Sequence, residues 1–144
     1  MTIWRASSLR VATAVALVGA ALVPAANAAT PPRNYSGQVA QGGSVTFTAS
    51  PGRGKVKTID QIMFGPVRAK CKQGSFNLGV IENGIKVAHG AFHFDRHSGG
   101  QHIVITGKFA SNYKSATGTL STTGNVNPAT NCMTGTDHWS AKQT

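Results

Sequence analysis

Four histidines and an aspartate lie close together in the sequence and could bind a metal ion. His89, His93, His97 and His102 fall within fourteen residues, with Asp95 among them. On an extended strand His93, Asp95 and His97 point to the same side, because alternate residues share a face. Imidazole and carboxylate groups suit Zn²⁺ or Cu²⁺. The candidate ligands are therefore His93, Asp95, His97 and His102, the last joining across a turn.

A simpler interpretation of these histidines is a solvated polar face opposite Phe92 and Phe94. A bulge expected near His89 would also change the direction of that side chain. The sequence favours the solvated face and leaves metal binding as the alternative.

The chain is strongly basic, so its Lys and Arg residues are a second group of candidate binding residues. Twelve of its fourteen Lys and Arg residues and all four acids follow residue 28, so twelve minus four leaves +8 there, of +10 in the whole chain. Two triplets, Arg53/Lys55/Lys57 and Arg68/Lys70/Lys72, would each form a stripe on one side of a strand. Such charge attracts polyanions. For an exported protein these are anionic wall polymers or acidic polysaccharides rather than nucleic acid; alternatively, the charge only maintains solubility.

Three aromatic residues are candidates for stacking on sugars. Tyr113 lies in an expected turn and is the best candidate for an exposed contact. Tyr35 opens the first expected strand and could be exposed or buried. Trp139 follows Cys132 closely, and we expect it to be buried beside a disulfide.

Catalysis is not the expected function. Glycoside hydrolysis usually needs two carboxylates flanking the bond, and the four acids are widely spaced, with no sign of a pair. The nucleophile-elbow sequence Gly-x-Ser-x-Gly is also missing. A small hydrolase remains an alternative, as does a protein-directed inhibitor or toxin, for which the 51–54 loop (Pro-Gly-Arg-Gly) is the first segment to inspect.

The first 28 residues have the parts of an export signal. Arg5 and Arg10 precede an uncharged run of Ala, Val and Leu over 11–23, and small residues at 26–28 suit signal peptidase. The run is shorter than the roughly 20 residues that a membrane-spanning helix needs. We therefore predict cleavage after Ala28, secretion, and no transmembrane segment in the remaining 29–144.

Cys71 and Cys132 are the only cysteines. In an oxidising compartment two cysteines in a small domain pair. Closing so long a loop would stabilise the fold by about 4 kcal/mol in the entropy model. A catalytic or metal-binding thiol is the minor alternative.

Residues 29–144 are predicted to form a single all-β domain. Leu and Glu are scarce there while Thr, Ser, Val and Gly abound, which favours short strands and turns. Asn83-Gly84 predicts a two-residue hairpin, and a bulge near 88–90 would reconcile the phases of the apolar residues on either side. About eight antiparallel strands result. They would form a two-sheet sandwich or, alternatively, a flattened barrel.

Three short segments carry a resemblance. They are 104–111 (VITGKFAS), 116–119 (ATGT) and 132–141, with its Cys-x-x-Gly and Trp139-Ser-Ala. Over roughly residues 70–142 the chain resembles small secreted β-sandwich proteins of high-GC Gram-positive bacteria. The resemblance implies the fold and export, but no activity and no site residues. The expected function is thus a non-enzymatic extracellular binding module with affinity for anionic polymers.

Overall fold

The structure is a computed structural model that describes residues 30–144; the predicted signal peptide lies outside them. The described chain is all-β. The strands are β1 Arg33–Val39, β2 Ser44–Gly52, β3 Lys55–Cys71, β4 Gly74–Lys86, β5 Ala91–Ser98, β6 Gln101–Phe109, β7 Ser115–Val126 and β8 Ala129–Gln143. The predicted all-β fold of about eight strands is confirmed.

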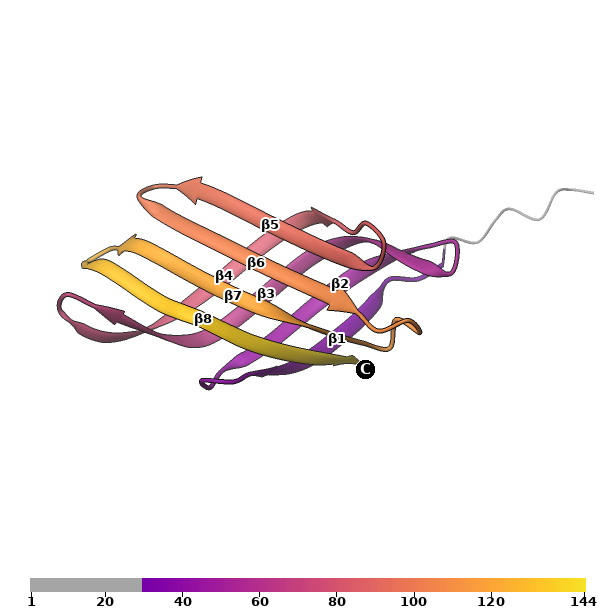
Figure 1. Ribbon diagram of the computed structural model, residues 1–144, viewed down its shortest axis with the longest axis horizontal. Helices are drawn as coiled ribbons and strands as arrows, with labels where there is room; N and C mark the ends of the chain where they lie inside the picture. Colours follow the sequence, from indigo (N-terminus) through magenta and orange to yellow (C-terminus); the bar gives the residue numbers. More distant parts are fainter. Residues whose placement is uncertain (1–29) are drawn as a thin grey trace, which may run out of the picture.

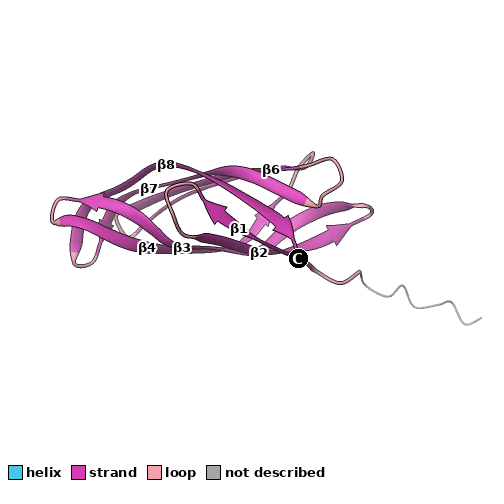
Figure 2. Cartoon of the chain, turned by 90° about the horizontal axis from the view of Figure 1, so that it is seen from below, coloured by secondary structure: helices cyan, strands magenta, loops and turns pink. Residues whose placement is uncertain are grey.

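All strands pair antiparallel in one continuous sheet of order β4-β3-β2-β1-β8-β7-β6-β5. The sheet folds over itself where β1 meets β8, so that β1–β4 form one layer and β5–β8 the other (Figures 1 and 2). The long strand β3 also reaches β8 at the pair Lys70–Met133. The two end strands, β4 and β5, do not pair with each other within residues 30–144, so the sheet does not close into a barrel. The predicted two-layer sandwich is the architecture that forms.

The core lies between the layers and is rich in aromatic residues. The inner sides of the strands bury six aromatic rings: Tyr35, Phe47, Phe64, Phe92, Phe109 and Trp139. The ring of Trp139 lies about 6 Å from those of Phe47, Phe64 and Phe92, at distances typical of favourable aromatic pairs. Gly107 leaves room for this packing, because a Cβ there would overlap the ring of Phe92. Alternation of apolar and polar residues along the strands builds this core, and register shifts between Thr48 and Ala49 and between Phe64 and Val67 interrupt it.

The prediction of a hairpin at Asn83-Gly84 is wrong. Strand β4 continues through this pair to Lys86. Gly84 has a positive φ of 68°, so the backbone is locally irregular there, but the strand does not end. The chain reverses instead at His89-Gly90, with φ values of 51° and 75° and hydrogen bonds between Ala88 and Ala91 in both directions. Two successive positive φ angles make this a tight two-residue turn, closed by the single bridge between Ala88 and Ala91 rather than by pairing of β4 with β5. The predicted bulge near 88–90 is therefore a turn. The apolar residues change from odd to even positions there because the chain leaves β4 and enters β5.

Cys71 and Cys132 form the predicted disulfide, which joins β3 to β8 across a sequence separation of 61 residues. The bridge lies in a small second cluster with Ala69, Leu78 and Ala129. Trp139 belongs to the larger cluster, so the expectation that it packs beside the bridge is wrong, although its burial is confirmed.

Candidate functional site

Three turns meet at one end of the sandwich and enclose a basic hollow of about 540 Å³, which we call the basic end. They are the β2–β3 turn, the β4–β5 turn and the β6–β7 loop. Arg53, Lys55 and Lys57 supply the charge, and His89 and Tyr113 line the same hollow. The sequence pointed to the 51–54 loop and to Tyr113 separately; the fold brings them together.

Backbone contacts fix the shape of the basic end. The amide of Val87 donates to the carbonyl of Lys57 at 2.9 Å, which ties the end of β4 to the start of β3. The amide of Phe109 donates to the carbonyl of Gly90 at 2.8 Å and ties the β4–β5 turn to β6. These two bonds hold the β4–β5 turn between β3 of one layer and β6 of the other, in the hollow that the basic residues also line.

Tyr113 is held in place by its own loop and by the core. It has a φ of 57°, and its amide donates to the carbonyl of Ala110 at 2.9 Å. The hydroxyl of Tyr35 donates to the carbonyl of Tyr113 at 2.6 Å. Burial raises the pKa of Tyr35, against the smaller opposing effect of Arg33, so this hydroxyl keeps its proton. The half-buried ring of Tyr113, packed at 5.5 Å from Phe109, is thus presented from a fixed position.

The positive charge of the basic end is not neutralised by the protein itself. None of the residues lining the hollow is acidic. In the described part of the chain the three basic residues form no ion pair within 4.0 Å; the ion pairs there join Arg96 to Glu82 and two histidines to Asp95. Asp60 accepts hydrogen bonds from Ser50 instead. The guanidinium and ammonium groups are left available to an external anion.

The second basic triplet lies elsewhere. Arg68 and Lys70 are exposed on the outer side of β3, with Asn77 and Ser75 as their cross-strand neighbours on β4. Lys72 is exposed in the β3–β4 turn next to the disulfide. The two triplets have the same composition and spacing, but only the first belongs to the 540 Å³ hollow.

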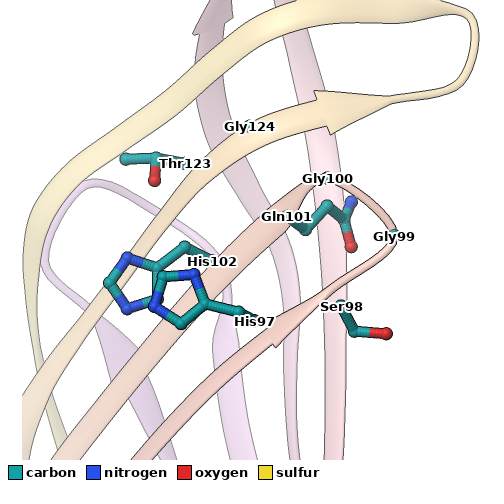
Figure 3. Close-up of a pocket in the computed structure, with 8 residues that line it drawn as sticks. All are labelled: His97, Ser98, Gly99, Gly100, Gln101, His102, Thr123 and Gly124. Atoms are coloured by element: carbon teal, nitrogen blue, oxygen red, sulfur yellow. The ribbon is translucent and has the colours of Figure 1, made fainter.

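Asp95, His97 and His102 form a second cluster on the outer side of β5 and β6. His97 and His102 are direct cross-strand partners, and their rings stack with centroids 3.7 Å apart (Figure 3). The Nε2 atom of His102 lies 2.9 Å from Oδ1 of Asp95, and Nε2 of His97 lies 3.7 Å from the same oxygen. One ligand atom from each residue lies within 4.8 Å of the others. The fold thus assembles three of the four predicted metal ligands.

His93, the fourth, is not part of this cluster. It is exposed on β5 and has Thr106 on β6 as its cross-strand partner. The group of potential ligands within 4.8 Å contains only Asp95, His97 and His102. The prediction that His93 joins them is wrong, because His102 lies across from His97 at the far end of β5.

Tyr35 and Trp139 cannot act as stacking platforms for sugars. Their relative exposures are 2% and 3%, because both point into the aromatic core. Of the three aromatic candidates, only Tyr113 is half-exposed, and it lines the basic hollow.

One polar pair was missed by the sequence reasoning. The side chain of Glu82, just before the Asn83-Gly84 pair, is buried and pairs with Arg96. Both residues lie on inner sides of end strands, at the open edge of the sandwich. The sequence holds one sign of this pair: Arg96 is two residues from Phe94 and four from Phe92, so it lies on the same side of the strand as these apolar residues.

No protein-family model, curated protein or solved structure matched the chain in the comparisons made. Within residues 30–144 there is no helix of the length and apolar character needed to cross a membrane. The resemblance to secreted β-sandwich proteins of high-GC Gram-positive bacteria stays a prediction.

Proposed function

We propose that this protein is an exported, non-enzymatic binding module that holds an anionic wall polymer or acidic polysaccharide at its basic end. The disulfide supports an oxidising, extracellular location. The export signal predicted over residues 1–28, with cleavage after Ala28, supports the same location.

The observation that carries the proposal is the convergence of Arg53, Lys55 and Lys57 on a hollow without an acidic residue. A guanidinium can form two parallel hydrogen bonds to one phosphate or carboxylate, whereas each ammonium acts as a point charge that follows a repeating anion. The repeating phosphates or carboxylates of a polymer would meet these groups together. A surface that served only for solubility needs no such convergence.

Tyr113 and His89 add groups that suit the uncharged part of such a polymer. Tyr113 offers an apolar ring and a polar hydroxyl, a combination that serves sugar and polyol units. The hydrogen bond from Tyr35 fixes its backbone in advance, which reduces the entropy lost on binding.

The test compares two triple variants that remove the same charge. One is Arg53→Gln/Lys55→Gln/Lys57→Gln, and the matched control is Arg68→Gln/Lys70→Gln/Lys72→Gln. The protein is expressed with its own leader and recovered from the medium. Its affinity for poly(glycerol phosphate) and for hyaluronate is measured at about 0.02 M and about 0.2 M NaCl, a range over which screening grows strongly.

We expect the first variant to lose at least about tenfold in affinity at the lower salt concentration, since lost charge-assisted hydrogen bonds are worth about 1.5–3 kcal/mol each. The control variant should lose much less. Equal losses of affinity in the two triple variants would show that binding depends on net charge and not on the basic end. No binding of either polymer by the unaltered protein at low salt would overturn the function itself.

A further inference from the structure

We propose that Asp95, His97 and His102 form a binding site for a divalent transition-metal ion, Cu²⁺ or Zn²⁺, independent of the basic end. It lies at the opposite end of β5 from His89. The proposal rests on the geometry of the three side chains and not on the proposed polymer binding.

The cross-strand pairing places the ligands. His97 and His102 are opposite each other in the β5–β6 ladder, while Asp95 precedes His97 by two residues and shares its side of the sheet. The three side chains therefore converge from two hydrogen-bonded strands. Such strands position ligands more precisely than loops do.

The distances are compatible with a shared ion, to which the stacked rings of His97 and His102 would turn their Nε2 atoms. Nε2 of His102 lies at hydrogen-bond distance from Oδ1 of Asp95, but Nε2 of His97 lies 3.7 Å from that oxygen, beyond such a bond. Ligand atoms around a tetrahedral Zn²⁺ are about 3.3 Å apart, since each lies about 2.0 Å from the metal. The two separations observed here, 2.9 and 3.7 Å, lie on either side of this value.

Asp95 has no competing strong cation. Its ion-pair partners in residues 30–144 are the two histidines alone. Arg96, its neighbour in sequence, points to the opposite side of β5 and pairs with Glu82. No Lys or Arg of the described residues therefore competes with the two histidines, or with a metal ion bound by them, for the carboxylate of Asp95.

Space for the ion and its waters adjoins the rings. A hollow of about 440 Å³ is lined by His97, His102 and the Gly99-Gly100 turn. Both glycines have positive φ, 59° and 78°, which the two-residue turn requires, and neither has a side chain to cover the rings (Figure 3). An incoming ion would take the place of the hydrogen bond between His102 and Asp95, whose proton would leave to solvent, and water would fill the ion's remaining positions.

Cu²⁺ should bind more tightly than Zn²⁺, because it stands higher in the general affinity order for nitrogen and oxygen ligands. The experiment is a calorimetric titration of the exported protein with each metal chloride. It is repeated with His97→Ala and Asp95→Asn and with the control His93→Ala, which removes a histidine from the same side of the same strand. We expect one site per chain, a loss of at least about tenfold in the first two variants and no change in the control, since even outer-shell changes cost 10–100-fold.

Electron paramagnetic resonance of the Cu²⁺ complex provides a second readout. Two imidazole nitrogens should couple to the copper in the unaltered protein and one in His97→Ala. Copper bound only at the N-terminal amine would survive in His97→Ala and would overturn the proposal. Equal weakening in His93→Ala, or no heat beyond dilution with either metal, would also overturn it. His97 is exposed over 74% of its side chain, so these variants should keep the fold, which an unchanged melting temperature would verify.

Discussion

Asp137 shows how strongly a single environment can alter an ionisable residue. It lies on the inner side of β8 between Thr134 and Trp139 and is fully buried. No described residue donates a hydrogen bond to either carboxylate oxygen. Burial raises the pKa of Asp137, against a smaller opposing effect of His138. The neutral acid is therefore the form that suits the core.

We expect Asp137→Asn to raise the Tm at pH 8 and to leave it nearly unchanged at pH 3. Because the folded-state pKa is raised, the stability that the neutral acid gives is complete below the unfolded pKa and is lost as pH rises through the folded pKa. The amide has no charge to desolvate at any pH. A gain of 1 kcal/mol corresponds to about 4 °C for a domain of this size. Melting curves across this pH range measure it; a Tm difference that does not grow with pH would contradict it.

Several residue positions could be predicted from sequence because alternation alone decides them. Ile103, Ile105 and Phe109 are buried, and Arg68 and Lys70 are exposed, as the period of two requires. Trp139 could not be placed in this way. Its partners Phe47, Phe64 and Phe92 come from three other strands, and no local pattern gives their arrangement.

At the scale of elements, β4 and β5 are the two ends of the sheet and face each other across its open edge. Only one ion pair spans this edge among the described residues, from Glu82 on β4 to Arg96 on β5. Burial raises the pKa of Glu82, and the positive charge of Arg96 opposes this rise. The positive charge of Arg96 thus offsets part of the desolvation cost of the buried Glu82 carboxylate.

We expect Arg96→Ala to lower the free energy of unfolding by about 1–3 kcal/mol at pH 7, the usual cost of a buried polar group that loses its partner. The loss should shrink towards pH 4, because Glu82 then takes up a proton and needs no counter-charge. Urea unfolding at both pH values measures this. In the matched double variant Glu82→Gln/Arg96→Ala the loss at pH 7 should largely disappear; if it persists in full, the pair does not stabilise the edge through charge.

The turns show the limit of sequence reasoning at this scale. Asn83-Gly84 and His89-Gly90 lie six residues apart, and either could supply residues with positive φ. Local preference favours Asn-Gly. The longer pairing of β4 with β3, which continues to Thr58–Lys86, outweighs it. The basic end depends on this choice, because the reversal at 89–90 brings His89 to the hollow that Arg53 also lines.

At the scale of the whole molecule, the disulfide joins β3 to β8, two strands that are distant in the sequence. We expect Cys71→Ala/Cys132→Ala to lose roughly 2–5 kcal/mol of unfolding free energy, because the unfolded chain is freed of a long closed loop. Urea denaturation midpoints measure this. A reducing agent should lower the midpoint of the unaltered protein and leave that of the double variant where it is. A double variant as stable as the oxidised protein would contradict the expected contribution.

The place of β8 in the sheet makes the two layers depend on one strand. Strand β8 pairs with β1, β7 and β3 and carries Trp139 into the middle of the aromatic core. Without β8, strands β1 and β7 would lose the neighbour that joins the two layers, and the rings of Phe47, Phe64 and Phe92 would lose their shared contact with Trp139. A substitution that unpairs β8 should therefore separate both layers together rather than loosen one of them.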